Sequence, residues 1–187
     1  MKFPFALAMM TLPILAACET LDEPQGGAPA QGVEVRMSKV TDGGIGEAIG
    51  VITLSDTPSG LSLRVDVKGL PAGDRGFHVH EKGDCSPALR DGKPVAALAA
   101  GGHYDAMASG RHEGPHGQGH SGDLPVLKVD AQGNAQLTLT APRLSLKEVR
   151  GRSIMIHEGG DNYSDQPKTL GGGGARIACG VIPAEAG

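Results

Sequence analysis

The sequence predicts an all-β fold with long functional loops, and three observations lead to this prediction. Thirty glycines and 13 prolines stand against three phenylalanines, two tyrosines and no tryptophan. Such a composition is typical of a chain shaped by turns. Short segments alternate apolar and polar residues between turn residues, which is the period of a half-buried strand. No long helix is predicted, although residues 145–149 could form one helical turn.

Eight segments have the pattern of strands. They cover residues 33–37, 48–54, 61–67, 77–81, 126–130, 135–140, 153–157 and 176–182. Glycine-, aspartate- and asparagine-bearing turns separate them, as expected for antiparallel strands. About eight short strands predict a sandwich or a barrel.

Two long segments, residues 82–125 and 158–175, interrupt the regular spacing of the strands. Loops of this length inside a compact domain are usually either functional or disordered. The first contains His103, His112, His116 and His120, four of the seven histidines of the chain. Function is therefore the favoured explanation.

The N-terminal segment has the features of an export signal. Lys2 precedes an apolar run over residues 3–17 that is too short to span a membrane. The run ends in Leu15-Ala16-Ala17-Cys18, which resembles a bacterial lipobox and indicates cleavage before Cys18 and lipid attachment to its sulfur. A plain signal peptide with an incidental cysteine is the alternative.

These features divide the chain into three parts: a lipoprotein-type signal peptide (1–17), a lipidated Cys18 with a flexible tether (18–31), and one folded domain (32–187). The net charge of −4 gives no indication of nucleic-acid binding. Cys85 and Cys179 remain as an even pair in an exported chain, which predicts a disulfide; two separate buried thiols are the alternative.

The histidines suggest a metal site. His78 and His80 lie at i and i+2 on a predicted strand, so both imidazoles project from one face. His103, His112, His120 and Asp123 fall in the long loop, and three imidazoles with one carboxylate suit tetrahedral zinc. A solvated histidine-rich loop that binds metals loosely is the alternative. His157 ends a third strand, and His116 is expected to be exposed.

Several motifs in register resemble copper/zinc superoxide dismutases, in particular the bacterial exported branch. These motifs are Gly76-Phe77-His78-Val79-His80-Glu81, Gly102-His103-Tyr104-Asp105, Gly119-His120-Ser121-Gly122-Asp123-Leu124, Ile156-His157-Glu158 and the segment Gly174 to Ile182. The resemblance covers about residues 33–182. It implies an eight-stranded antiparallel Greek-key sandwich or barrel of the immunoglobulin-like type, with two long functional loops.

The resemblance also implies the roles of individual residues. Copper would bind His78, His80, His103 and His157, and zinc would bind His103, His112, His120 and Asp123. The shared His103 and the anion-guiding Arg176 would be the catalytic residues. Asp161 would hydrogen-bond one copper ligand and one zinc ligand and thereby orient both. Lys168 would add attraction for the anion at the channel rim.

The implied activity is the conversion of two superoxide anions to oxygen and hydrogen peroxide, with copper alternating between Cu(II) and Cu(I) and zinc structural. A non-catalytic copper carrier and a zinc-stabilised scaffold are the rival readings, but Arg176 and the complete set of copper ligands favour the enzyme. The expected location is the periplasm, with attachment to a membrane, the outer membrane being favoured, only through the N-terminal lipid. A monomer and a homodimer are both compatible with the sequence.

Overall fold

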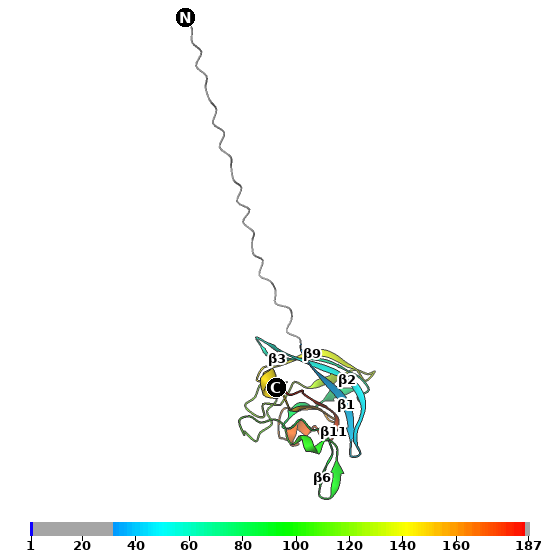
Figure 1. Ribbon diagram of the computed structural model, residues 1–187. Coiled ribbons are helices and arrows are strands. Elements are labelled where there is room, and N and C mark those ends of the chain that lie inside the picture. Colours follow the sequence, from blue (N-terminus) through cyan, green and yellow to red (C-terminus); the bar gives the residue numbers. More distant parts are fainter. Residues whose placement is uncertain (2–31, 186–187) are drawn as a thin grey trace.

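The computed structural model describes Met1 and residues 32–185. Its main element is a seven-stranded antiparallel sheet, shown in Figure 1. In spatial order the strands are β5 (Phe77–His80), β10 (Ser153–His157), β11 (Arg176–Val181), β1 (Val33–Thr41), β2 (Gly44–Thr57), β3 (Gly60–Val67) and β9 (Ala135–Ala141). Apart from Met1, the predicted signal peptide, Cys18 and the tether lie outside the described residues.

Two small sheets complete the strands. In one, β4 (Gly73–Arg75) pairs with β8 (Leu127–Val129), and in the other, β6 (Ala88–Arg90) pairs with β7 (Lys93–Val95). Only Gly76 separates β4 from β5, and β8 leads into β9 by a turn at Asp130 to Asn134. The β4–β8 pair therefore connects the two edges of the large sheet, and the connection from β3 to β4 crosses between those edges. This arrangement confirms the predicted antiparallel sandwich or barrel with Greek-key connections.

All eight predicted strands are present, and the helical turn is α1 (Leu146–Val149), preceded by Ser145 as its N-cap. The structure adds the three-residue strands β4, β6 and β7, which the sequence pattern did not reveal. The first long loop is thus partly regular, since it contains the β6–β7 hairpin and a 3₁₀ turn at Leu98–Ala100. Figure 1 shows this hairpin projecting from the body of the domain.

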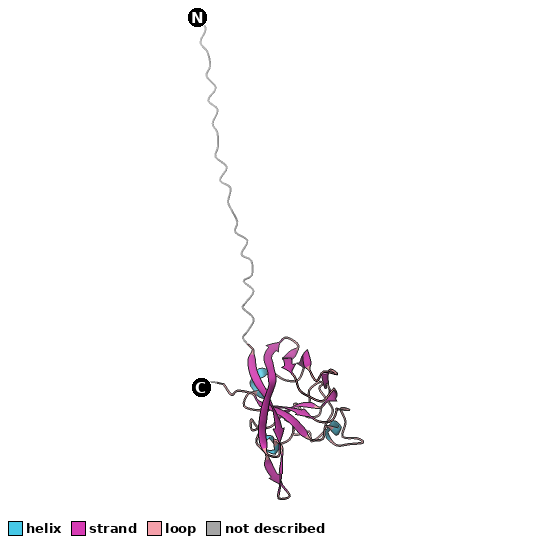
Figure 2. Ribbon diagram, turned by 90° about the vertical axis from the view of Figure 1, so that its right-hand side faces the viewer, coloured by secondary structure: helices cyan, strands magenta, loops and turns pink. Residues whose placement is uncertain are grey.

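The interior follows the alternation of the strands. In β3, Leu61, Leu63, Val65 and Val67 are buried, and Arg64 between them is exposed. In β5 all four residues are buried: Phe77 and Val79 belong to the hydrophobic core, whereas the long loops cover His78 and His80 on the other face. Figure 2 shows how these loops gather beside the long strands.

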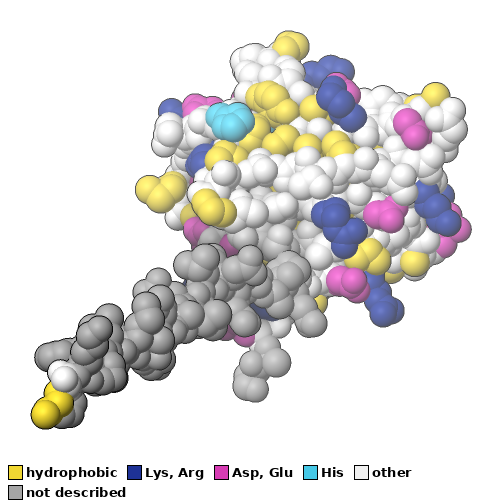
Figure 3. Space-filling view, turned by 90° about the horizontal axis from the view of Figure 1, so that it is seen from above, with side chains coloured by type: hydrophobic (Ala, Val, Ile, Leu, Met, Phe, Trp, Pro, Cys, Tyr) yellow, Lys and Arg dark blue, Asp and Glu magenta, His cyan; other side chains and the backbone are white. Residues whose placement is uncertain are grey.

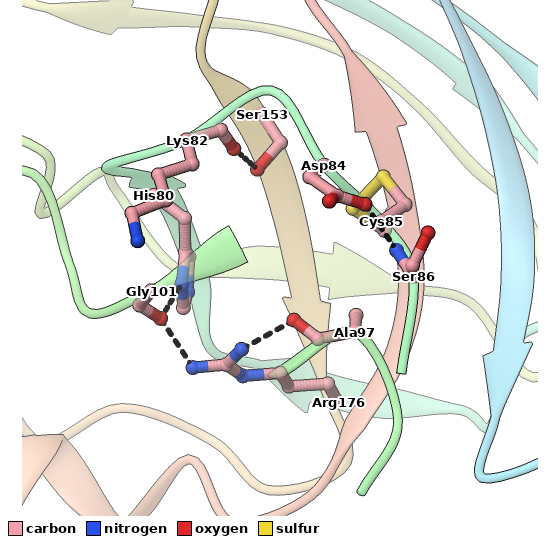
Figure 4. The surroundings of a disulfide bond; sticks show 10 residues. His80, Lys82, Asp84, Cys85, Ser86, Ala97, Gly101, Ser153 and Arg176 are labelled. Atoms are coloured by element: carbon pink, nitrogen blue, oxygen red, sulfur yellow. Dashed lines mark hydrogen bonds between the residues drawn. A yellow bond between two sulfur atoms is a disulfide. The ribbon is translucent and has the colours of Figure 1, made fainter. Parts of the chain in front are cut away.

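Cys85 and Cys179 form a disulfide, as predicted, across a sequence separation of 94 residues. Figure 4 shows that it ties the loop after β5 to β11. Closing a loop of this length stabilises the fold by roughly 4 to 5 kcal/mol on the chain-entropy model. The disulfide therefore restrains the segment that surrounds the histidines.

The surface carries charges of both signs. Figure 3 shows basic and acidic side chains spread over the face seen from above, with a group of hydrophobic side chains between them. Within residues 32–185, no helix has the length and apolar character needed to cross a membrane.

Candidate metal centre

The sheet holds three of the histidines at neighbouring positions. His78 and His80 lie on β5, which pairs with β10 so that His78 is opposite Met155 and His80 is opposite Ser153. His157 ends β10 and lies opposite Arg176 of β11. Because three adjacent strands carry these four residues, their relative positions are fixed by backbone hydrogen bonds.

Two backbone bridges attach the second half of the first long loop to β5. His103 forms a bridge with His80, and Asp123 forms one with His78. Hydrogen bonds on both sides of Val79 support them: its N–H donates to the Gly122 carbonyl at 2.9 Å, and its carbonyl accepts the Tyr104 N–H at 2.8 Å. The fold thus brings residues 20 or more positions apart into contact with the strand histidines.

The seven predicted ligand residues form one buried cluster. Each has at most 9% of its surface exposed, and the lowest value is the 0% of His78. The ring of His103 lies at the centre, with its centroid 3.9 Å from that of His78, 5.1 Å from His80 and 5.3 Å from His120. Such burial of six imidazoles requires that their ring nitrogens have partners.

Two groups of potential ligand atoms emerge from this cluster. One consists of His78, His80, His103 and His157, which is the predicted copper set. The other consists of His78, His103, His112 and Asp123, so it contains His78 where the prediction has His120. The His120 Nδ1 atom is nevertheless only 3.5 Å from Asp123 Oδ1.

The residues fit a pair of metal ions because four buried ring nitrogens have no hydrogen-bond partner. They are His78 Nδ1, His103 Nε2, His112 Nδ1 and His120 Nδ1. A buried polar atom left unpaired costs about 1 to 3 kcal/mol. His112 Nδ1 lies 2.9 Å from Asp123 Oδ2 without hydrogen-bond geometry, as two ligands of one ion would. Four such atoms in one cluster indicate metal ligation.

Hydrogen bonds at a second ring nitrogen orient most of these imidazoles. Asp161 lies between the two groups: its Oδ2 is 2.8 Å from His78 Nε2, and its Oδ1 is 2.7 Å from His112 Nε2. The Nδ1 atoms of His80 and His157 face the carbonyls of Gly101 and Gly174 at 3.0 and 3.3 Å. These contacts leave His78 Nδ1 and the Nε2 atoms of His80 and His157 directed into the site.

The environment makes most of these histidines neutral. Burial lowers the pKa of His78, and it lowers those of His80 and His157 well below the usual value. Burial and the neighbouring His78 lower the pKa of His103 to about 4. Neutral imidazole is the form that binds metals.

The pKa values on the carboxylate side of the site are shifted in a different way from those of the strand histidines. Burial would lower the pKa of His112, but the carboxylates of Asp123 and Asp161 outweigh it and raise this pKa to about 9. Burial would likewise raise the pKa values of Asp123 and Asp161, but hydrogen bonds from histidines hold both well below the usual value. Both carboxylates are therefore ionised and supply negative charge to the site.

Arg176 lies beside the strand histidines. Its guanidinium donates to the carbonyls of Ala97 at 2.5 Å and Gly101 at 2.6 Å, as Figure 4 shows. Gly101 is also the hydrogen-bond partner of His80, so one carbonyl holds both side chains. Arg176, His80, His103 and His157 line a cavity of about 330 Å³, which can admit a small anion.

Two further cations border the same region. Lys168 lines an adjacent cavity of about 380 Å³ with His103 and His157. Arg90 of the β6–β7 hairpin lines the cavity of Arg176, and burial together with the charge of Arg90 lowers the pKa of Arg176. Arg90 was not predicted as a site residue, because the hairpin that positions it was not predicted either. His116 is exposed, as expected.

An antiparallel β fold whose strands and loops gather six imidazoles and one carboxylate into one buried cluster, with two adjacent groups of potential metal ligands, defines the class of a metal-binding protein. Residues 48–182 match the family model described as copper/zinc superoxide dismutase (SODC). The chain belongs to the copper/zinc superoxide dismutase family, which confirms the resemblance seen in its motifs.

Individual proteins similar to this chain support the same family. The chain is 53% identical over 178 residues to superoxide dismutase [Cu-Zn] 2 of Salmonella typhimurium, and the match covers 95% of this chain and 97% of the relative. The Cu/Zn superoxide dismutase structure from Brucella abortus has 50% identity and a TM-score of 0.80, with 81% of this chain and 99% of the other covered. The monomeric enzyme from Salmonella enterica has 56% identity and a TM-score of 0.72, with 80% and 97% covered.

Proposed function

We propose that this chain is a superoxide dismutase in which copper binds His78, His80, His103 and His157, and zinc binds His103, His112, His120 and Asp123. The observation that carries the proposal is the set of four buried ring nitrogens without partners, which lie in one cluster around His103. Family membership supplies the identity of the two metals. Copper provides one-electron redox chemistry between Cu(II) and Cu(I), whereas zinc has no accessible redox change.

His78 belongs to the copper set and His120 to the zinc set. His78 has only Nδ1 free, because its Nε2 is engaged by Asp161, and Nδ1 can serve one ion. His78 stacks on His103, which explains why it is close to both groups. His120 has its own unpaired Nδ1 beside Asp123, so it is the remaining zinc ligand.

His103 is the shared ligand and one of the two catalytic residues. Its Nδ1 is 2.9 Å from Asp123 Oδ1, and its Nε2 faces the copper set without a partner. When both nitrogens bind metals, the ring must lose its proton, which two nearby dications favour. Dismutation of two superoxide anions consumes two protons, and His103 Nε2 would hold one of them for the departing peroxide only while it is not coordinated to copper.

Arg176 is the second catalytic residue. Its guanidinium offers planar donors and a fixed positive charge at the cavity that contains His80, His103 and His157. The two carbonyls that accept from it also limit its movement, so that the charge stays near the copper set. Lys168 and Arg90 extend the positive field towards the cavity rim, which raises the rate of anion encounter in a net-negative chain.

The dismutation rate of the protein from residue 19 onward, with copper and zinc measured on the same sample, tests the proposal. We expect a rate near the diffusion limit that follows copper occupancy and falls as salt rises. Full loading with both metals and negligible turnover would contradict it and favour a copper carrier.

The proposal includes export, with residues 1–17 as signal peptide, residues 18–31 as lipidated cysteine and tether, and residues 32–187 as the enzyme domain. The apolar leader ending at Cys18 supports this, and the Cys85–Cys179 disulfide suits the oxidising periplasm. The lipid would hold the domain at a membrane, most simply the outer one. Radiolabelled palmitate should enter the wild-type chain but not Cys18→Ser, and equal labelling of both would contradict lipidation at this residue.

The oligomeric state we propose is a monomer, because a relative of 56% identity is described as monomeric. A homodimer remains the other outcome of a sedimentation measurement on the metal-loaded protein.

A further inference from the structure

Asp165 joins the two long loops through both oxygens of its carboxylate. Its Oδ2 accepts a hydrogen bond from the backbone N–H of His112 at 2.9 Å. Its Oδ1 accepts one from the backbone N–H of Leu170 at 3.1 Å. These two bonds lower the pKa of Asp165, so the carboxylate is ionised and accepts both. A single side chain thus holds one residue of each loop.

At one end of this connection lies a zinc ligand. The ring of His112 is fixed by Asp161 at Nε2 and approaches Asp123 through Nδ1. These contacts orient the ring only if its Cα stays in place, and the Asp165 bond restrains the backbone at that residue. Asp161 and Asp165 therefore act on the same histidine from the same loop, one through the ring and the other through the main chain.

At the other end lies the rim of the copper-side cavities. Leu170 borders both the cavity that contains Lys168 and the one that contains Arg176. Its φ of 53° lies in the left-handed region, which a branched side chain rarely adopts. The hydrogen bond to Asp165 satisfies the Leu170 N–H and restrains the residue in this conformation.

The two long loops also pack closely against each other beside Leu170. A Cβ at Gly171, the residue after Leu170, would be 2.0 Å from Asp161 Oδ1 and 2.8 Å from His112 Nε2. A displacement of the His112 ring would therefore also shift the segment that contains Leu170 and Gly171.

We propose that Asp165 is a positioning residue that couples the zinc ligand His112 to the Leu170 rim of the copper channel. Zinc binding then orders the rim, and loss of Asp165 weakens zinc binding. The inference rests on the proposed assignment of His112 to zinc. It goes beyond that assignment because it links the zinc site to the shape of the entrance.

The test compares wild-type protein with Asp165→Ala and Asp165→Asn. Zinc affinity is measured by competition with a chromophoric chelator, and the visible spectrum is recorded with Co(II) in place of zinc. Hydrogen exchange at Leu170 is followed with and without zinc. The asparagine amide keeps one acceptor oxygen, so it should retain one of the two hydrogen bonds and give the smaller effect.

We expect Asp165→Ala to weaken zinc binding about tenfold, to alter the Co(II) spectrum, and to abolish the zinc-dependent protection of Leu170. Asp130→Asn is the matched control, because Asp130 also accepts two backbone N–H groups, those of Gln132 and Asn134, within a turn remote from the histidines. It should change thermal stability without changing zinc affinity or the spectrum.

Wild-type zinc affinity in a folded Asp165 variant, or unchanged protection of Leu170 by zinc in Asp165→Ala, would overturn the proposal. If Asp165→Ala does not fold, the asparagine variant decides by the same criteria. No measurement here uses dismutation, so a wild-type protein that binds zinc but lacks turnover would contradict the proposed function while leaving this inference intact.

Discussion

The two halves of the metal centre are built in different ways. His78, His80 and His157 stand on the adjacent strands β5 and β10, whose register fixes their positions. His112, His120 and Asp123 lie on an irregular segment that two backbone bridges, at His103 and Asp123, attach to β5. The strand half is shaped by backbone hydrogen bonds, whereas the loop half depends on side chains such as Asp161 and on the disulfide. Rigid strands suit a reaction site, and a loop clamped by its metal suits a structural one.

Removing the disulfide should have the largest effect, and it should affect the loop half of the metal centre more than the strand half. Replacing Cys85 and Cys179 by serine should lower the free energy of unfolding by about 4 to 5 kcal/mol, roughly a thousandfold in the equilibrium constant. Urea denaturation of the metal-free protein measures this change, and hydrogen exchange should increase more around residues 82–125 than in β5 and β10. Wild-type protein in reductant should behave like the double variant; a loss under about 1 kcal/mol would show that the disulfide does not stabilise the loops.

Removing one ligand from each half gives the next largest effect. His157→Ala should reduce dismutation by at least about 100-fold and keep zinc, because a direct ligand matters more than its outer partners. His120→Ala should instead reduce zinc affinity by a similar factor. Metal analysis alongside activity distinguishes them, with the exposed His116→Ala as the control. Full activity and normal metal loading in His157→Ala would refute its assignment to copper.

The charge next to the strand half should have a smaller effect. Arg176→Ala should slow dismutation about tenfold and weaken its dependence on salt, since the local positive field is lost. The dismutation rate of Arg176→Lys should lie between those of the wild type and Arg176→Ala, because lysine keeps the charge but not the planar donors. Rates at two ionic strengths check this. Arg64→Ala on β3 removes the same charge far from the cavity, and an equal effect there would mean that only net charge matters.

Of the residues considered, Lys168 should contribute least to the dismutation rate. Its side chain lies at the rim on an exposed segment, so Lys168→Ala should reduce the low-salt rate only about twofold and have no effect at high salt. The control is Lys147→Ala in α1, which removes an exposed charge of the same sign. A decrease that persists at high salt would indicate a role other than steering.

The strand half was the more predictable one. The alternation around Phe77 and Val79 predicts β5 and places His78 and His80 on one face, and the structure bears this out. Asp161 could be identified through the family resemblance, and the structure shows it in contact with His78 and His112. Asp165 and Arg90 could not be found in this way, because their partners are backbone groups and a cavity that exist only once the loops are folded.

The sequence by itself determined the all-β class, the metal-binding residue types and the pairing of Cys85 with Cys179, because alternation, ligand chemistry and an even cysteine count are local or countable properties. Only the tertiary structure decided which nitrogen of each imidazole faces the site, how Gly101 holds both His80 and Arg176, and which loop residues meet His112. The physical reason is that these features depend on contacts between segments up to 83 residues apart. Hydrogen-bond geometry between such segments is set by packing, which leaves no periodic trace in the sequence.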